Sequence, residues 1–275
     1  MVRELVGSVE ALWRYPVKSM LGEKLNDSVV TSTGLLGDRA YALLDVQSGK
    51  IASAKNPKKW AKLLDFRSAF MEQPHTSDSI PAVKIFLPNG DSITNETPDA
   101  SKILSDLLGQ TIKILSSVPE AASLEQYWPS VEGTTHQDAI TQIVMPSGTF
   151  FDACSIHLIT TATLARLQEL YPEGQFDPRR FRPNLVIKPN SSKIDFLEND
   201  WVDSTLAIGN EVRLSIDTVC PRCVVTTLAQ TDLPNDLNIL RTTARYNKVI
   251  AGIRTSVIQA GTIHCNDSIW LEKAT

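Results

Sequence analysis

Short runs of alternating apolar and polar residues, separated by turn sequences, recur along this 275-residue chain. Residues 8–15 alternate in this way and end at Pro16, and residues 82–87 and 91–94 flank a Pro-Asn-Gly turn, which is a strong hairpin signal. Such a density of short strands and turns is typical of antiparallel sheets rather than of helical bundles. We therefore predict a mostly antiparallel β domain over residues 1–118.

Only a few segments have the period of an amphipathic helix. Residues 160–170 present one apolar face, and residues 98–108 are followed by a glycine that can cap a helix. Residues 116–148 have little apolar periodicity and several Pro, Ser and Gly residues, which predicts a linker or domain seam. We expect two domains, residues 1–118 and 119–275, in a mostly β (α+β) chain with a few short helices.

The composition excludes several classes of protein. Hydrophobic residues make up 42% and charged residues 21%, as in ordinary soluble proteins, and the net charge of −4 argues against a nucleic-acid binder. No stretch approaches the ~20 apolar residues that span a bilayer, and the N-terminus has no signal-peptide pattern. Four irregularly spaced cysteines do not form a disulfide framework. We expect no membrane span and a cytoplasmic location.

Two of the four cysteines lie at CxxC spacing, in the sequence C-P-R-C at residues 220–223. Residues 212–216 before them alternate like a half-buried strand, and residues 224–228 after them are mostly β-branched, which also predicts a strand. The pair is therefore predicted to lie at a strand-to-strand connection.

Four interpretations of the cysteine pair compete. A thioredoxin-like redox pair places its attacking cysteine at a helix N-terminus, whereas a strand is predicted after Cys223. A structural zinc site needs four ligands, but Cys154, Cys265 and the four histidines form no second CxxC and no HxxxH. Two interpretations stay open: two buried cysteines that act as small hydrophobes, or one thiolate that ligates a soft transition metal while Arg222 offsets its charge.

Four basic positions share one trait, which is a place in a loop near the end of a predicted strand. They are Lys18-Ser19, Asp38-Arg39, Arg182-Pro183-Asn184 and Arg222-Cys223. Arginine forks suit phosphate or carboxylate, although each position taken alone also fits a solvated or ion-paired surface residue. Arg182 has apolar neighbours, and a guanidinium removed from water needs an anion. We expect Arg182 to be more desolvated than Lys18.

Thr160 marks the step from a predicted strand to a predicted helix. Its hydroxyl can cap that helix, and the same unpaired N–H groups can hold a phosphate. His157 on a predicted strand fits a core histidine, and His264-Cys265 fits a structural turn. No GxGxxG, Walker, HExxH or nucleophile-elbow motif is present.

Several motifs occur in an order that resembles a known family. They are Y-P-V-K-S (15–19), G-D-R-A-Y-A-L-L-D (37–45), H-L-I-T-T-A-T-L (157–164), F-R-P-N-L-V-I (181–187), C-P-R-C-V-V-T-T (220–227) and G-T-I-H-C-N-D-S-I-W-L (261–271). Together they resemble MOSC-domain proteins with an N-terminal β-barrel domain, a group that includes the mitochondrial amidoxime-reducing component and its bacterial relatives. Asn266 stands where the family usually has glycine.

The resemblance implies a fold, a cofactor and site residues. The fold is an N-terminal β-barrel-like domain followed by a C-terminal MOSC β-barrel domain. Cys223 matches the cysteine that ligates molybdenum, and Arg222 precedes it. The residues that match positions holding the pterin and phosphate of the molybdenum cofactor are Lys18, Ser19, Arg39, Arg182 and Asn184, with Thr160 near the phosphate.

The resemblance also implies an activity. It is that of a molybdenum-dependent oxidoreductase that reduces N-hydroxylated or N-oxide small molecules with electrons from a separate electron-transfer protein. The alternatives are a carrier or sulfur-transfer accessory protein without substrate turnover, and a β-rich protein that binds another phosphate ligand in its basic pocket.

We expect four departures from the family pattern. Residues 229–236 stand in place of the D-P-D-T-G turn of the amidoxime-reducing proteins, which leaves the substrate open. We expect no membrane anchor and no fused iron–sulfur domain. We also expect no pyridoxal-phosphate sulfurase domain, so pyridoxal phosphate binding is only a label of the wider family.

Overall fold

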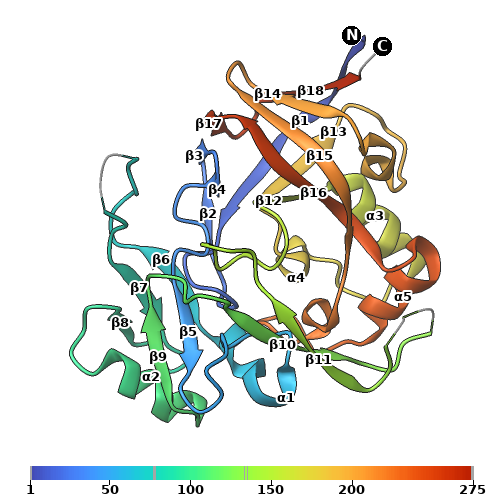
Figure 1. The fold of residues 1–275 in the computed structure, drawn as a ribbon. Helices are drawn as coiled ribbons and strands as arrows, with labels where there is room; N and C mark the ends of the chain where they lie inside the picture. The colour runs from blue at the N-terminus through green and yellow to red at the C-terminus, as the bar shows by residue number, and fades with distance from the viewer. Residues whose placement is uncertain (1, 77–78, 133, 135, 274–275) are drawn as a thin grey trace.

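The computed structural model describes residues 2–76, 79–132, 134 and 136–273 (Figure 1). It is mostly β with a few short helices, which confirms the predicted fold class. In Figure 1 a barrel fills the upper right, and smaller sheets lie below it and to its left. No helix among the described residues is long and apolar enough to cross a membrane.

Seven strands close the barrel in the order β13-β12-β16-β15-β14-β18-β1, because β1 also pairs with β13. Their bounds are β1 (Val2–Arg14), β12 (Ile156–Thr160), β13 (Leu185–Pro189), β14 (Thr205–Ile208), β15 (Val212–Pro221), β16 (Ile250–Gln259) and β18 (Ser268–Lys273). Within the barrel β12 and β13 run parallel, and a parallel pair needs a crossover connection. The helices α3 (Thr161–Leu170) and α4 (Pro178–Phe181) supply it.

The first strands of the chain belong to the barrel rather than to a separate domain. β1 pairs with both β13 and β18, β2 (Glu23–Leu25) pairs with β1, and β3 (Asp27–Thr31) joins β17 (Gly261–His264) and β4 (Gly34–Leu35). Leu25, Val30 and Leu35 bury their side chains in the same apolar core as the barrel strands.

A second apolar core lies within the N-terminal sheets. Its backbone elements are β5 (Ala42–Asp45), α1 (Pro57–Trp60), η1 (Ala61–Asp65), β6 (Arg67–Phe70), β7 (Val83–Phe86), β8 (Ser92–Thr94), α2 (Ala100–Leu108) and β9 (Ile112–Leu115). The predicted hairpin around Asn89-Gly90 is formed by β7 and β8, and the predicted helix ends at Gly109, whose φ of 70° suits glycine.

The predicted linker over residues 116–148 is wrong in its centre. β10 (Ser123–Trp128) and β11 (Ala139–Val144) form an antiparallel hairpin there, and Leu124 and Met145 join a small core with Ala42. We missed these strands because they are buried on one side only and polar turn residues surround them. The predicted division between residues 118 and 119 stays a prediction, but β1 to β4 cross it by pairing and packing with the barrel.

The predicted strand over residues 224–228 is also wrong. These residues form the 3-10 helix η3 (Val224–Thr227), so the cysteine pair lies between a strand and a helical turn. The hydroxyls of Thr226 and Thr227 donate to the carbonyls three residues earlier, at 3.0 and 2.7 Å. Such local hydrogen bonds offset the β propensity of branched residues, which depends strongly on context. The remaining helical elements are η2 (Leu197–Trp201) and α5 (Asn238–Asn247), for which we predicted no helix.

Candidate functional site

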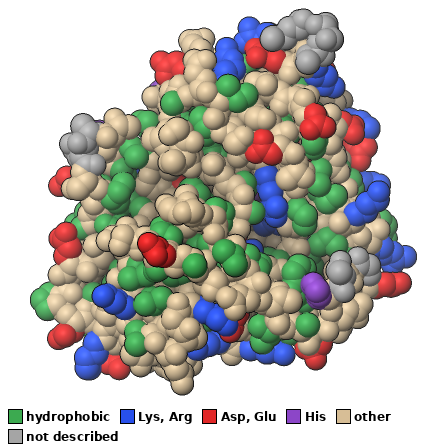
Figure 2. Space-filling model, in the orientation of Figure 1, with side chains coloured by type: hydrophobic (Ala, Val, Ile, Leu, Met, Phe, Trp, Pro, Cys, Tyr) green, Lys and Arg blue, Asp and Glu red, His purple; other side chains and the backbone are tan. Residues whose placement is uncertain are grey.

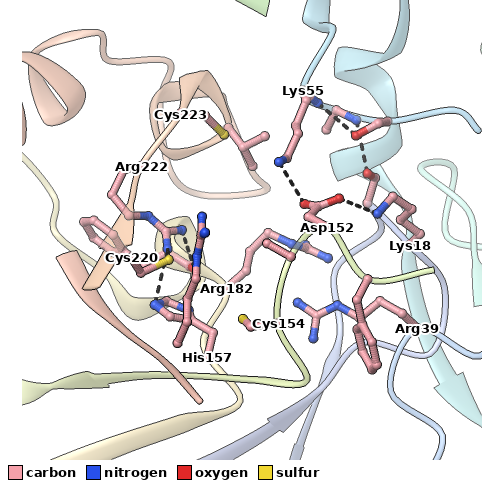
Figure 3. Close-up of a pocket in the computed structure, with 18 of the residues that line it drawn as sticks. Lys18, Arg39, Lys55, Asp152, Cys154, His157, Arg182, Cys220, Arg222 and Cys223 are labelled. Carbon is pink, nitrogen blue, oxygen red and sulfur yellow. Dashed lines mark hydrogen bonds and ion pairs between the residues drawn. The ribbon is translucent and has the colours of Figure 1, made fainter. Parts of the chain in front are cut away.

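A pocket lies where the ends of the barrel strands meet the N-terminal sheets, and it gathers nearly all the predicted site residues (Figure 3). Those in its lining are Lys18, Ser19, Arg39, Arg182, Asn184, Arg222 and Cys223. The pocket encloses about 840 Å³ when the open space at its mouth is included. Residues more than 200 positions apart therefore meet at one place.

Positive charge dominates the pocket although the chain is acidic overall. Its lining includes the cations Lys18, Arg39, Lys55, Arg182, Arg222 and Arg254, against the single carboxylate of Asp152. On the face shown in Figure 2, Lys and Arg side chains are visible in the recess between the barrel and the parts below it. A cavity with this charge favours an anionic ligand, because low-dielectric walls focus the field of its cations.

Asp152 joins two of these cations. Its carboxylate accepts hydrogen bonds from Lys18 Nζ at 2.5 Å and pairs with Lys55 Nζ at 3.2 Å. Burial would raise the pKa of Asp152, but the two ammonium groups hold it well below its usual range. Lys18 also donates to the carbonyl of Phe150 at 2.7 Å and is only 4% exposed. Lys18 is therefore not the better-hydrated residue that we expected; it is buried and its charge is neutralised.

Arg39 has a carboxylate of its own. Its guanidinium pairs with the buried Asp38, which also accepts from the backbone N–H of Tyr15 at 2.8 Å and from Asn184 Nδ2 at 3.0 Å. Asn184 Oδ1 in turn accepts from the backbone N–H of His157 at 3.1 Å. Asn184 therefore holds three segments of the pocket wall together, and its amide is occupied by protein groups.

Arg182 has no carboxylate partner among the described residues. Its Nη1 donates to the carbonyl of Met20 at 2.8 Å, and its guanidinium lies 4.3 Å from the centre of the Tyr15 ring. Burial and the neighbouring Arg39 lower the pKa of Arg182 to about 10. Its charge is desolvated without a counter-ion, so an anion in the pocket would relieve that cost.

Arg222 contacts Cys220 rather than Cys223. Its Nη1 donates to the sulfur of Cys220 at 3.0 Å and its Nη2 to the carbonyl of Phe181 at 2.6 Å, and its Nε is buried without a partner among the described residues. Cys223 is half-buried, and its sulfur makes no hydrogen bond to any described residue. Of the two thiols, Cys223 is the one free to bind a metal.

Three of the lining residues have backbones in the left-handed region. The φ angles are 65° at Ser19, 50° at Arg39 and 52° at Arg182. Non-glycine residues adopt this region rarely, and such strain gathers at functional sites because the surrounding structure must hold it. The hydroxyl of Ser19, for example, accepts from the backbone N–H of Ala54 at 3.1 Å.

Thr160 does not reach the pocket. It is fully buried, its hydroxyl oxygen accepts from the backbone N–H of Thr163 at 3.1 Å, and the same hydroxyl donates to Glu198 at 2.7 Å. The capping interpretation of Thr160 is therefore confirmed, and its expected place near a phosphate is not supported: its hydroxyl is already used inside the protein.

Several lining residues were not anticipated. Four of them lie outside the recognised motifs: Lys55, Asp152, Cys154 and Arg254. His157 was expected to be a core histidine. Local sequence held no signal for them, because only the meeting of distant loops brings them together. No three His, Cys, Asp or Glu side chains gather as a metal site within residues 2–76, 79–132, 134 and 136–273, which gives the zinc interpretation no support.

Comparison with known proteins assigns this chain to a family. Residues 6–73 match the family model described as MOSC N-terminal beta barrel domain, and residues 147–270 match that of the MOSC domain. This chain belongs to the MOSC-domain proteins that carry an N-terminal MOSC β-barrel domain.

Relatives of this MOSC protein include two from Homo sapiens. Mitochondrial amidoxime reducing component 2 is 26% identical over 247 residues, which cover 81% of this chain and 67% of the relative. Mitochondrial amidoxime-reducing component 1 is 24% identical over 238 residues, which cover 81% of this chain and 66% of the relative. Among solved structures, the YUAD protein from Bacillus subtilis aligns with all of this chain at 10% identity and a TM-score of 0.48.

One departure from the family pattern has a structural account. Asn266, where MOSC proteins usually have glycine, lies at φ 71°, a left-handed conformation that asparagine tolerates better than most residues. The turn between β17 and β18 is kept because His264 N donates to Asp267 Oδ2 at 2.7 Å. The turn that leads into β18 is therefore formed with asparagine at this position.

The pocket residues fit a molybdenum cofactor. An anionic pterin phosphate suits a cavity in which Arg182 has no carboxylate and Arg222 leaves a buried Nε unpaired among the described residues. The half-buried thiol of Cys223 is a soft donor of the kind that such metals accept. The donor set and the excess of cations thus agree with the group that the family resemblance implies.

Proposed function

We propose that this MOSC protein binds the molybdenum cofactor in the basic pocket and reduces N-hydroxylated or N-oxide small molecules there. One observation supports this proposal most strongly. Among the described residues, Arg182 has no carboxylate partner and the sulfur of Cys223 makes no hydrogen bond, and both line one cavity. Bound molybdenum would supply a centre that exchanges two electrons. The electrons would come from a separate electron-transfer protein, as the family resemblance implies.

Some pocket residues would bind the ligand, and others hold the segments of the pocket wall in place. Arg182, Ser19 and the Lys18–Asp152–Lys55 group face the cavity and would bind the anionic part of the cofactor. Asn184 and the Asp38–Arg39 pair are already bonded to neighbouring segments, so they would act chiefly by orienting the wall.

Cys223 would be the protein ligand of the metal. The sulfur of Cys220 already accepts a hydrogen bond from Arg222, whereas that of Cys223 has no such partner among the described residues. Lys55 lies near Cys223. Burial would lower the pKa of Lys55, but Asp152 and, to a smaller extent, Cys223 raise it. Lys55 would therefore offset the thiolate charge, a task that the sequence had assigned to Arg222.

The substrate class rests on the names of the relatives, two of which are amidoxime reducing components. The segment after η3 differs from theirs and has its own fastening: Arg179 pairs with Asp232, and Arg180 donates to the carbonyls of Leu228 and Pro234. A different turn after η3 is compatible with a different N-hydroxylated substrate.

Metal analysis of the purified protein and of two variants tests this proposal. We expect wild type to retain molybdenum, Cys223→Ser to lose nearly all of it and Cys220→Ser to keep most of it, because a hydroxyl is a much poorer ligand for a soft metal. Reduction of benzamidoxime with a reduced viologen dye as electron source should follow the metal content.

Three outcomes would change the proposal. Equal loss of metal from both variants would contradict a single cysteine ligand. Stoichiometric molybdenum without turnover of any N-hydroxylated compound would favour the carrier or sulfur-transfer alternative. Absence of molybdenum from freshly purified wild type would favour a protein that binds another phosphate ligand.

A further inference from the structure

The first cysteine of the C-P-R-C motif has an environment of its own, which the proposed metal site does not use. Cys220 lies at the end of β15, and its sulfur accepts a hydrogen bond from Arg222 Nη1 at 3.0 Å. The same Nη1 also lies 3.3 Å from Nε2 of His157, which comes from β12. Figure 3 shows Cys220, Arg222 and His157 grouped on one side of the pocket, away from Asp152.

The two arginines that line the pocket with Cys220 favour its anionic form. Arg254 comes from β16 and Arg222 from the loop after β15, and the imidazole of His157 on β12 lies in the same lining. Asp152, the carboxylate in that lining, is paired with Lys18 and Lys55. A sulfur surrounded by N–H donors and cations is stabilised as thiolate, as in other reactive cysteines.

The acid–base behaviour of the two neighbouring thiols agrees with this geometry. Burial would raise the pKa of Cys220, but His157, Arg222 and Arg254 together hold it well below its usual range. Burial and the negative charge of Cys220 instead raise the pKa of Cys154 to about 12. The pocket therefore favours the thiolate form at Cys220 and the thiol form at Cys154.

The position of His157 is built into the fold. Gly252 on β16 has φ 87°, and a Cβ at this position would lie 2.5 Å from His157 Nε2 and 2.4 Å from the carbonyl oxygen of Leu158. Only glycine leaves room for the imidazole against the strand backbone. The Cys–His arrangement thus depends on a specific backbone feature and is not an accident of side-chain rotation.

We propose that Cys220 is a reactive thiolate and a site of covalent modification by small anionic disulfides, of which glutathione disulfide is the chemical type. The thiolate attacks one sulfur of the disulfide and the sulfur–sulfur bond breaks. One half stays on Cys220 as a mixed disulfide and the other leaves as a thiolate, so no further oxidant and no proton is needed. Arg182 and Arg254 attract the carboxylates of such a reagent.

Modification of Cys220 would also act on the pocket. A mixed disulfide carries no charge on its sulfur, so Arg222 would lose its anionic partner, and the added group would occupy the cavity. Any anionic ligand of the pocket would then be excluded until a thiol reduced the mixed disulfide. This inference goes beyond the proposed function, since it requires no molybdenum.

Two thiosulfonate reagents of similar size and opposite charge test the proposal on the purified full-length protein. The sulfonatoethyl reagent is anionic and the trimethylammonioethyl reagent is cationic, and peptide mapping by mass spectrometry gives the rate at each cysteine. After normalisation to a free thiol, we expect Cys220 to react fastest of the four cysteines, with a preference of about tenfold or more for the anionic reagent. High salt should reduce that preference.

Glutathione disulfide should then give a mixed disulfide at Cys220, more slowly in His157→Gln and Arg254→Gln. Arg241→Gln, which changes an exposed arginine on α5, is the matched control and should leave the rate unchanged. Inorganic pyrophosphate should protect the wild-type protein, a measurement that needs no variant to fold. Preferential reaction at Cys223 or Cys265, no preference for the anionic reagent, or no protection by pyrophosphate would overturn the proposal.

Discussion

Arg182 and Lys18 bring different net charges to the same pocket. Lys18 is the more deeply buried, but Asp152 neutralises it, whereas Arg182 has no carboxylate among the described residues. The sequence pointed to Arg182 because of its apolar neighbours. The structure also singles out Arg182, but for another reason. Arg182 has no counter-ion among the described residues, and this matters more than its depth of burial.

We therefore expect Arg182→Ala to weaken binding of the cofactor more than Lys18→Ala does. Loss of a charged hydrogen-bond set should cost ~1.5–3 kcal/mol, roughly a ten- to hundredfold change in affinity. Lys18→Ala leaves Asp152 paired with Lys55, so its effect should be smaller. Dissociation of the cofactor from both variants, measured at several salt concentrations with Arg241→Ala as control, checks this. A larger loss for Lys18→Ala would contradict it.

At the scale of elements, a buried carboxylate joins η2 to the N-terminus of α3. Glu198 is fully buried and accepts from the hydroxyls of Thr160 and Thr163 at 2.7 Å each, and no lysine or arginine pairs with it among the described residues. Burial raises the pKa of Glu198, although these hydrogen bonds oppose the shift. Thr160 and Thr163, where β12 passes into α3, thus donate to a carboxyl group inside the protein.

The stability of the protein should depend on pH through Glu198. Because its folded pKa is raised, its protonated form stabilises the fold below the ordinary glutamate pKa of about 4.3, and this contribution is lost as the pH rises through the folded pKa. Glu198→Gln should remove that loss, so the variant should gain stability relative to wild type from pH 4 upward, by about 1.4 kcal/mol per unit of pKa displacement.

Urea unfolding of Glu198→Gln at several pH values between 4 and 8 measures this difference. Glu173→Gln changes an exposed glutamate after α3 and serves as control. A constant free-energy difference between wild type and Glu198→Gln across the range would show that Glu198 titrates normally in the folded protein.

At the scale of the whole molecule, the chain closes its C-terminal barrel with its own N-terminus. Val2 pairs with Lys273, and β1 fills the gap between β13 and β18. Residues 2–35 also contribute Leu25, Val30 and Leu35 to the barrel core. Without this segment the barrel would have two open strand edges and an incomplete core.

A fragment of residues 119–275 should therefore not fold cooperatively by itself. A second fragment, in which residues 2–35 follow residue 275 through a flexible linker, should recover a barrel, because β18 ends beside the start of β1. Circular dichroism and thermal unfolding of the two fragments make the comparison. Cooperative unfolding of the shorter fragment alone would contradict the role assigned to β1.

Local sequence by itself determined the elements whose signals are local. Alternation predicted β1, Asn89-Gly90 predicted the hairpin of β7 and β8, and the apolar face of residues 160–170 predicted α3. The order of motifs also pointed to the family and to seven residues of the pocket lining. These features depend on neighbouring residues or on fixed residue types, which a sequence displays directly.

Only the tertiary structure decided what depends on distant partners. Glu198 withdrew Thr160 from the pocket, although the two residues come from different elements. The structure also placed Asp152 between Lys18 and Lys55, which lie far before it in the chain. Hydrogen bonds and ion pairs between segments far apart in the chain set which charges are neutralised, and no local pattern records them.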